Sequence, residues 1–545
     1  MDAIMEEIKL IPGTERIFHR NADCEGNFFR SEVIDLLPQL SSSSNDPLNW
    51  SLLRKLWHTF LLLFITGLTS ASTNSTWLAQ EAMFNEYNIS FGKVDFGSAV
   101  LFMGIGLGTF LLSPIAFLYG RRLPYLIYIL MSIIGMLWML FERTRQDSIW
   151  NQLFVGASGA VVEANVQLSL SDIWVGSHRG SALGLYVLVT SIGTFLGPFV
   201  NSFVLQYMGW RWIPQLSIII FSILLLVFYF GLEETLYHRP VRRKGSASSD
   251  RSVFSSHSRI STEFLKSSRD EQCKERDHVR ANTYSDTTQP YLERIRLVTY
   301  APNLVGYGLR QYRDRLLKTL QVFVFPAVFY SGIQWGAQDA WVNFYLKIQQ
   351  DDWMEAPYNF TQFQSGLMNI PTIIGAIIGC FWGGYLSDYF VVYMAKRRDG
   401  ISEAEDLLWM MLPCLIFSPL GLLIFGIGTA DSWNYYWSFT GLGLIGFGWG
   451  CAGDLSLSYL MQAYPDMVLE GMVGVSLINN GVGGLSSLVC IYWFDVSGVR
   501  DCIIGVSCLS FFFLFLTIPM MIWGKDCRHW SCKRYQEFVR SRDAI

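Results

Sequence analysis

Runs of about 20 apolar residues recur along almost the whole sequence, and this feature constrains the fold more than any other. A helix of that length crosses the apolar core of a bilayer and satisfies its own backbone hydrogen bonds. Hydrophobic residues make up 51% of the 545-residue chain and charged residues only 16%, which excludes an ordinary soluble protein. The predicted fold is therefore all-α, a polytopic membrane protein with twelve transmembrane helices near residues 57–79, 95–118, 123–141, 150–172, 181–206, 213–232, 319–346, 363–386, 407–428, 435–459, 471–494 and 502–524.

The twelve runs form two groups of six, separated by a long polar stretch. Residues 238–317 are rich in Ser, Arg, Lys, Asp and Glu, which predicts a largely disordered linker. Part of this linker, residues 304–318, mixes apolar and basic residues and is open to a second interpretation, a helix lying on the membrane surface. The predicted organisation is an N-terminal tail, a six-helix half, the linker, a second six-helix half and a C-terminal tail, over residues 1–56, 57–237, 238–317, 318–524 and 525–545.

Basic residues gather at one end of the predicted spans. Because Lys and Arg favour the cytosolic side of a membrane, we expect this end, with both termini and the linker, to be cytosolic. The plasma membrane is the default location. Asn88 and Asn359 begin glycosylation acceptor patterns in the opposite, outer loops. The basic residues are Arg54, Lys55, Arg121, Arg122, Arg179, Arg239, Arg242, Arg243, Lys244, Lys396, Arg397, Arg398, Lys525 and Arg528.

Several function classes lack their sequence signals. The formal net charge of −4 argues against a nucleic-acid partner. No nucleophile paired with a base, no spaced set of metal ligands and no phosphate-binding loop stands out, so we predict neither an enzyme nor an ATP-driven pump. We expect no cofactor and no metal. The predicted partners are a small-molecule substrate, protons and the lipid bilayer, and we expect a monomer.

Two six-helix halves joined by a linker are the layout of secondary transporters that bind cargo near the middle of the membrane. The sequence SPIAFLYGRR over residues 113–122, between the second and third spans, resembles the signature loop of the major facilitator family. Phe117 and Leu118 occupy positions where that family usually has Asp followed by Arg, so its usual charge clamp cannot be complete and gating must depend on other contacts. The resemblance implies gating roles for Gly120, Arg121 and Arg122.

A second copy of this loop follows the eighth span. The sequence GYLSD over residues 384–388 keeps the acidic residue, with basic residues at 396–398. A glycine turn with cytosolic charges would explain either copy alone, but two copies at matching places favour the signature loop. The resemblance assigns gating roles to Gly384 and Asp388.

The fifth span contains the sequence GTFLGP over residues 193–198, which resembles the antiporter motif of drug:proton antiporters. Glycines four residues apart let helices approach closely, and a proline loosens the local hydrogen bonds. The family continues with two more glycines where this chain has Asn201 and Ser202. Close helix packing without antiport therefore stays an alternative for Gly193, Gly197 and Pro198.

The resemblance to fungal multidrug-type facilitators extends over nearly the whole chain. The segments NDPLNW at 45–50, GWRW at 209–212 and EET at 233–235 carry it, together with Arg179-Gly180. The fourth span, with GAS at 156–158 and VVEA at 161–164, looks most like the branch of polyamine and histidinol carriers. Gln152 stands where other facilitators have a basic residue.

Three carboxylates lie inside predicted spans, where ionisable residues are costly and usually face a cavity or a partner. They are Glu163, Asp339 and Asp454, and no Lys or Arg lies comparably deep. A lone carboxyl held away from water favours its protonated form, which suits a group that loads and releases protons. We predict proton coupling at all three, with Glu163 first. The alternative for each is a protonated, hydrogen-bonded structural carboxyl.

Polar and aromatic residues recur near helical spacing around Asp339. Trp335 and Gln338 lie one turn or less away, and aromatic rings attract cations, so this segment suits a cationic or amphipathic cargo. The predicted substrate-binding residues are Asn74, Glu163, Trp335, Gln338, Asp339 and Asn479. For each asparagine the alternative is a hydrogen bond that holds helices together.

The leading hypothesis is a proton-coupled transporter that exports small organic molecules, such as xenobiotics or a secondary metabolite, by alternating access. Its rival is proton-driven uptake of organic cations such as polyamines, which the unpaired acids and the fourth span favour. A third hypothesis, from another class, is a membrane sensor that does not transport, because the signature loop is incomplete and the linker is long.

Overall fold

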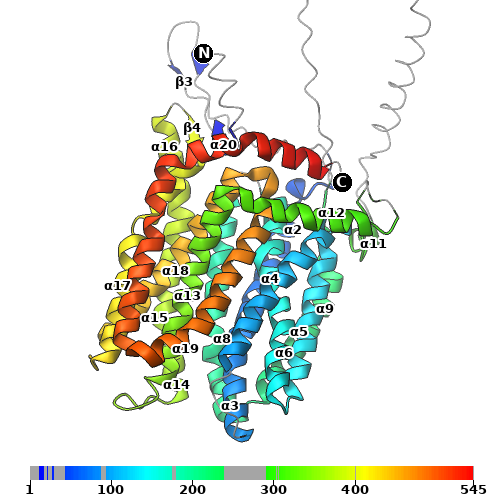
Figure 1. Ribbon diagram of the computed structural model, residues 1–545. Coiled ribbons are helices and arrows are strands. Elements are labelled where there is room, and N and C mark those ends of the chain that lie inside the picture. Colours follow the sequence, from blue (N-terminus) through cyan, green and yellow to red (C-terminus); the bar gives the residue numbers. More distant parts are fainter. Residues whose placement is uncertain are drawn as a thin grey trace, which may run out of the picture.

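The structure is a computed structural model that describes residues 11–16, 21–22, 28–29, 43, 45–87, 94–174, 179–237, 290–301, 304, 306–398 and 400–543. Long helices run side by side in one bundle, while α12 and α20 lie across one end of it (Figure 1). We call this end the linker end. The end at which α3 and α14 lie is the far end (Figure 1).

The first half of the chain forms six spans, of which the first and fourth are interrupted. A short helix, η1 (Pro47–Asn49), precedes them, and Asp46 caps it by accepting a hydrogen bond from the Leu48 amide. The helices are α2 (Leu52–Thr73), α3 (Thr76–Tyr87), α4 (Val94–Leu118), α5 (Arg122–Leu140), α6 (Arg145–Ala160), η2 (Val161–Asn165), α7 (Val166–Ile173), α8 (Arg179–Met208) and α9 (Trp212–Gly231).

The second half repeats this pattern with a longer last pair of helices. Its elements are α11 (Tyr291–Arg294), α12 (Leu309–Thr319), η4 (Leu320–Val324), α13 (Pro326–Asp351), α14 (Gln362–Leu367), α15 (Asn369–Cys380), η5 (Phe381–Leu386), α16 (Ser387–Arg397), η6 (Ala404–Met411), α17 (Cys414–Ala430), α18 (Tyr435–Ala463), η7 (Pro465–Met467), α19 (Val468–Phe515) and α20 (Thr517–Asp543).

Four short strands form two small antiparallel pairs. β1 (Thr14–Arg16) pairs with β4 (Ile401–Glu403), and Thr14 lies opposite Glu403. β2 (Asn21–Ala22) pairs with β3 (Phe28–Phe29). The first pair joins residues near the N-terminus to the second half of the bundle, a contact that the sequence did not predict.

The helices agree with the predicted twelve-span architecture. Among the described residues, nine helices are long and apolar enough to cross a membrane, and the bent pair of α12–η4 with α13 makes a tenth. The helical stretch Pro465–Arg542 holds two spans, because Gly498 has a positive φ of 72° that interrupts α19. The remaining span is the glycine-rich α18, which packs against α15 and α17.

The seventh span begins later than we predicted. The apolar run from 319 includes η4, but Phe325 is extended at φ −88° and ψ 118°, and Pro326 starts α13 as a separate helix. Proline lacks an amide hydrogen and is favoured at the first position of a helix. As a result α12 and η4 lie at 84° to α13 and do not extend the span.

The prediction of disorder is wrong for residues 290–317 as far as the structure describes them, and within residues 304–318 the structure has the helix of the second interpretation. They contain α11 and α12, and the amides of Thr299 and Ala301 donate to the carbonyl oxygens of Tyr119 and Leu118. Residues 238–289 lie outside the described part of the chain. The predicted C-terminal tail is also helical, because α20 continues to Asp543.

Contacts of α4 and α8 with elements of the second half join the two halves of the bundle. α4 packs against α19, where Ser476 Oγ donates to Thr109 Oγ1 at 3.2 Å. α8 packs against α14, α15 and η5. At the last contact a methyl group on Gly184 would lie 3.1 Å from the Cα of Gly384, so the two backbones nearly touch.

Candidate functional site

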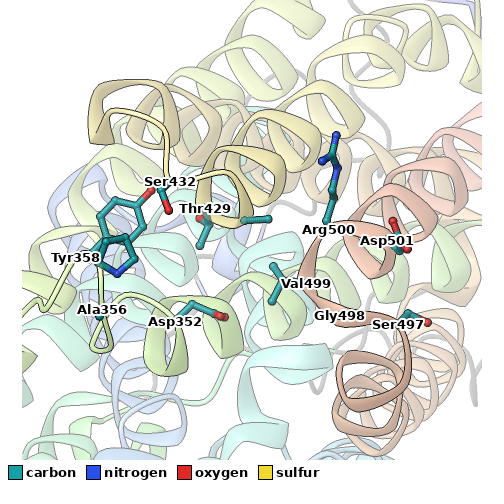
Figure 2. A pocket seen from close by; sticks show the side chains of 12 residues that line it. Asp352, Ala356, Tyr358, Thr429, Ser432, Ser497, Gly498, Val499, Arg500 and Asp501 are labelled. Carbon is teal, nitrogen blue, oxygen red and sulfur yellow. The ribbon is translucent and has the colours of Figure 1, made fainter.

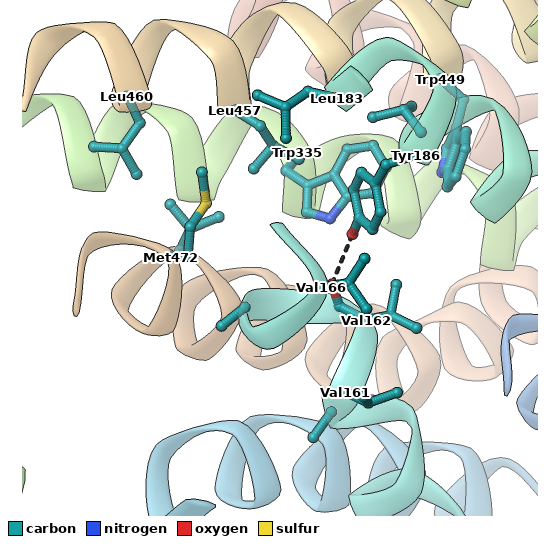
Figure 3. Packing of buried hydrophobic residues seen from close by; sticks show 14 of the residues in the cluster. Val161, Val162, Val166, Leu183, Tyr186, Trp335, Trp449, Leu457, Leu460 and Met472 are labelled. Atoms are coloured by element: carbon teal, nitrogen blue, oxygen red, sulfur yellow. Dashed lines mark hydrogen bonds between the residues drawn. The ribbon is translucent and has the colours of Figure 1, made fainter. Parts of the chain in front are cut away.

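Glu163 lies in η2, a π-helical turn in the middle of the fourth span. Such a turn contains one more residue than an α-helical turn and often occurs at functional sites. The hydroxyl of Tyr186, on α8, donates to the carbonyl oxygen of Val162 at 2.9 Å and so supports this turn (Figure 3). Gln167 in turn donates to the Tyr186 hydroxyl at 3.0 Å.

The structure brings Glu163 together with Asp339, which belongs to the other half of the chain. The two carboxyls interact electrostatically, and the amide of Asn479 on α19 interacts with both. The Asn479 side chain is only 1% exposed, yet neither its nitrogen nor its oxygen has the distance and angle of a full hydrogen bond to another described residue. Glu163 and Asp339 themselves are half-buried. Three of the predicted residues therefore lie together between the halves. We call Glu163 and Asp339 the central acid pair, and Asn479 lies beside both.

Aromatic side chains border the central acid pair. Trp449 Nε1 donates to Asp339 Oδ1 at 2.8 Å, and the rings of Trp449 and Trp335 have centroids 4.7 Å apart. Figure 3 shows Trp335, Trp449 and Tyr186 close together. Acidic oxygens beside aromatic faces attract organic cations. We predicted Trp335 from its spacing, but nothing in the sequence distinguished Trp449 or Tyr186 from other aromatic residues in spans.

Gln338 and Asn74 have different surroundings. Gln338 is buried and accepts a hydrogen bond from Ser418 at 3.4 Å, while its Nε2 has no partner among the described residues. Asn74 lies at the break between α2 and α3, and its amide donates to the Ser70 carbonyl at 2.9 Å. The contacts of Asn74 are thus those of a helix end.

Asp454 has other contacts than the central acid pair. It interacts with Asp388, and its Oδ1 accepts a hydrogen bond from Ser458 at 3.4 Å. Methyl groups on Gly184 and Gly384 would lie 3.2 and 2.9 Å from its Oδ2, which has no hydrogen-bond partner among the described residues. Asp454 therefore belongs to the contact between α8 and η5.

Comparison with known proteins identifies the family. Residues 59–489 match the family model of the Major Facilitator Superfamily. The chain belongs to this superfamily. It is therefore a membrane transporter of small molecules and not an enzyme. The human organic anion transporter MFSD10 shares the fold, with a TM-score of 0.52 over 84% of this chain and 99% of that one, at 15% identity.

Fungal members of the superfamily are similar over most or all of this chain. The uncharacterized MFS-type transporter C1271.10c of Schizosaccharomyces pombe is 43% identical, covering 100% of this chain and 96% of its own. Protein HOL1 of Saccharomyces cerevisiae is 38% identical over 98% of each chain. The probable efflux pump mfs2 of Aspergillus flavus is 21% identical over 82% of this chain and 97% of its own.

The first signature loop of this superfamily member is held by acids that we did not predict. Gly120 has a φ of 99°, and the amides of Arg121 and Arg122 that follow donate to the carboxylate of Glu234 at 2.8 and 3.3 Å. Arg121 also pairs with Asp172 at 3.2 Å. Burial raises the pKa of Glu234, although the bonds from these amides oppose the shift. Glu234 caps the start of α5, so the loop has an acidic partner despite its missing Asp.

The second signature loop connects the two halves directly. Gly384 lies in η5, and the carboxylate of Asp388 accepts a hydrogen bond from Ser181 Oγ, on α8, at 3.1 Å. This contact lies near Asp454 and Gly184, described above. Both loops are at the linker end of the bundle (Figure 1).

The glycine motif of the fifth span lies against the first span. A methyl group on Gly193 would lie 3.0 Å from the Cα of Gly67, and one on Gly197 would lie 2.6 Å from the Cα of Ala71. Pro198 follows inside α8, which continues to Met208. The motif thus makes a close contact between α2 and α8.

The far end holds a pocket of 540 Å³ that sequence reasoning missed (Figure 2). Asp352 and Asp501 line it, and Arg500, also in its wall, pairs with Asp431 at 3.3 Å. Burial and the neighbouring acids raise the pKa of Asp352 to about 6. Of the predicted glycosylation sites, Asn359 is exposed near this pocket's loop, whereas Asn88 lies outside the described residues.

Proposed function

We propose that this transporter couples proton movement to the transport of small organic cations. The observation that carries the proposal is the central acid pair: Glu163 and Asp339 come from opposite halves and interact with each other. Neither forms a salt bridge with any residue that the structure describes. Negative charge between the halves then needs either a proton or a cationic cargo, so the two compete for one place.

The surroundings of the acids support a cationic cargo. Trp335 and Trp449 offer ring faces beside Asp339, and the amide of Asn479 lies against both carboxyls, where it adds a polar group to the site. Such a combination fixes an ammonium group by charge, by ring quadrupoles and by hydrogen bonds. Alternating access of the two halves would expose this site to each side of the membrane in turn.

Export is the first candidate direction. Its support is the motif at Gly193 and Gly197, which resembles that of drug:proton antiporters and makes the contact between α2 and α8. Uptake of cations such as polyamines is the second candidate. It is favoured by the two unpaired acids and by the fourth span, which resembles that of polyamine and histidinol carriers.

We further propose the membrane arrangement of the chain. The linker end carries the basic loops and is placed in the cytosol together with both termini, and the plasma membrane is the proposed location. The two halves are residues 57–237 and 318–524, and one chain suffices for transport. Proton-coupling and substrate-binding roles are proposed for Glu163, Asp339 and Asn479, and a gating role for Asp388, which binds Ser181.

The test measures the accumulation of labelled spermidine and of a cationic dye in cells that lack the gene for this transporter. Cells express the wild type, Glu163→Gln, or the matched control Asp501→Asn, whose acid lies in the far-end pocket. Lower dye accumulation that an uncoupler abolishes supports export, and raised spermidine uptake supports import. Whichever of these two changes the wild type produces, Glu163→Gln should abolish it and Asp501→Asn should retain it. Binding without flux would contradict transport and favour a sensor.

A further inference from the structure

The helix α12 lies across the linker end of the bundle. It precedes α13 at an angle of 84°, so it runs roughly parallel to the plane of a membrane that the long helices cross (Figure 1). The hydroxyl of Tyr312 donates to the carbonyl oxygen of Leu111 on α4 at 2.6 Å. Leu111 and Leu107 of α4 are exposed, as residues facing lipid would be. The helix α12 therefore lies at the edge of the apolar surface of the bundle.

The outward face of α12 mixes apolar and basic side chains. Leu309, its first residue, is 75% exposed, Leu317 is also exposed, and Tyr307, two residues before the helix, is 89% exposed. Arg310 and Arg313 lie on the same face, with side chains 89% and 67% exposed. Exposed leucines are unfavourable in water, whereas a helix at a membrane surface places them at the boundary of the acyl chains.

The charge of α12 is strongly positive. Its sequence holds four basic residues and one acid, Asp314, which pairs with Arg313 at 3.0 Å and with Arg310 at 4.0 Å. An exposed pair of this kind contributes little, so Asp314 offsets only part of the attraction to an anion. Basic residues beside exposed leucines complement an anionic headgroup above its acyl chains.

We propose that α12 binds anionic phospholipid of the leaflet at the linker end. Arg310 and Arg313 contact the headgroup, and Leu309 and Leu317 contact the upper acyl chains. Because α12 touches α4 of the first half and leads into α13 of the second half, the bound lipid lies beside the contact between the halves. This proposal does not depend on the cargo or on proton coupling.

The test measures lipid binding to the purified full-length chain in a neutral detergent. The probes are phosphatidylserine and phosphatidylcholine with the same acyl chains, titrated by native mass spectrometry. Each basic residue near an anionic surface strengthens attraction by roughly fivefold. With Asp314 offsetting part of this, Arg310→Gln/Arg313→Gln should weaken phosphatidylserine binding by about tenfold. Asp314→Asn should strengthen it.

The controls separate this site from general attraction. Arg143 and Arg145 lie at the turn from α5 to α6, at the far end. Arg143→Gln/Arg145→Gln removes the same charge there and should leave phosphatidylserine binding unchanged. Binding of phosphatidylcholine should be the same in every variant. Water-soluble glycerophosphoserine should not compete, because it lacks the acyl chains that the leucines contact. An unchanged affinity in the α12 variant, an equal loss in the control, or competition by the soluble headgroup would each overturn the proposal. A melting temperature measured without lipid verifies that every variant is folded.

Discussion

The indole N–H of Trp449 donates to the carboxylate of Asp339 at 2.8 Å, from one helix of the second half to another. Asp339 accepts this bond through Oδ1. Its carboxyl also interacts with Glu163 of η2 and with the amide of Asn479 of α19. If the central acid pair binds cargo as proposed, loss of the Trp449 bond should change that binding.

Trp449→Phe should impair transport while preserving most of the aromatic packing. Loss of a hydrogen bond to a charged group costs about 1.5–3 kcal/mol, which corresponds to a rise in KM of roughly tenfold or more. The measurement is initial transport rate against cargo concentration in cells. Trp530→Phe, on the exposed part of α20, is the control and should retain the wild-type KM. Equal KM values for both variants would show that the Trp449 bond is irrelevant to cargo.

Gly197→Ala should destabilise the protein through the contact with α2. The added methyl group would lie 2.6 Å from the Cα of Ala71, so the helices must move apart, at a cost of about 1–3 kcal/mol. The melting temperature of purified protein measures this loss. Gly481→Ala on α19 is the matched control, because its methyl group meets nothing within 4 Å and Ala is the better helix former. A stabilising Gly197→Ala would contradict the close contact.

Glu142 should make stability depend on pH near neutrality. It lies between α5 and α6, accepts a hydrogen bond from Asn151, and burial, followed by the charge of Asp147, raises its pKa to about 8. A raised carboxyl pKa means that the folded state binds the proton more tightly than the unfolded state. The contribution of Glu142 to the free energy of unfolding is therefore highest below pH 4.5 and is lost as the pH rises toward 8.

Glu142→Gln keeps an oxygen that accepts from Asn151 but cannot ionise. We expect it to be more stable than the wild type at pH 8, by roughly 1–3 kcal/mol, and nearly equal at pH 5. The measurement is the melting temperature against pH. Glu293→Gln, at an exposed position, should follow the wild-type profile. Parallel profiles for Glu142→Gln and the wild type would refute this assignment.

Arg528 should stabilise the linker end through a buried ion pair. Its guanidinium is fully buried and pairs with Glu405, and it also donates to the Pro12 carbonyl and to Thr14 Oγ1 at 3.2 Å. Arg528→Met leaves Glu405 buried without its partner and should cost about 3–5 kcal/mol. Adding Glu405→Leu should recover part of this loss, as a double-mutant cycle measures.

Asn359 tests the proposed orientation. If the far end faces the outside of the cell, protein made in a eukaryotic host should carry a glycan at this exposed residue. An endoglycosidase should then increase the gel mobility of the wild type but not that of Asn359→Gln/Asn88→Gln. An epitope at the C-terminus that antibodies reach only after permeabilisation would agree with the same orientation, and one reached in intact cells would contradict it.

Much of the architecture could be predicted because it depends on local composition. The length of an apolar run is enough to identify a span, and this held even for α18, whose glycines reduce its apolar content. The start of the seventh span was misplaced for the same reason. Residues 319–324 are as apolar as a span, and only the extended Phe325 before Pro326 turns them away from it.

The candidate site was predictable only in part. Glu163 and Asp339 can each be identified from the sequence, because each is an ionisable residue within an apolar run. Glu234 lies just after a span, where acids are ordinary, so nothing marked its role in capping the first signature loop. Asp454 appeared equivalent to the other two acids, yet its contacts are Asp388 and Ser458.

The sequence by itself determined the number of spans, the two halves, the superfamily and the acids within the membrane, because each of these depends on residue type along one stretch of chain. Only the tertiary structure decided that Glu163 meets Asp339 and Asn479, and that Trp449 holds Asp339. These residues are separated by up to hundreds of positions, and their contacts depend on the packing of η2, α13, α18 and α19 against one another. Helix packing follows from the shapes of many side chains at once, which no local pattern contains.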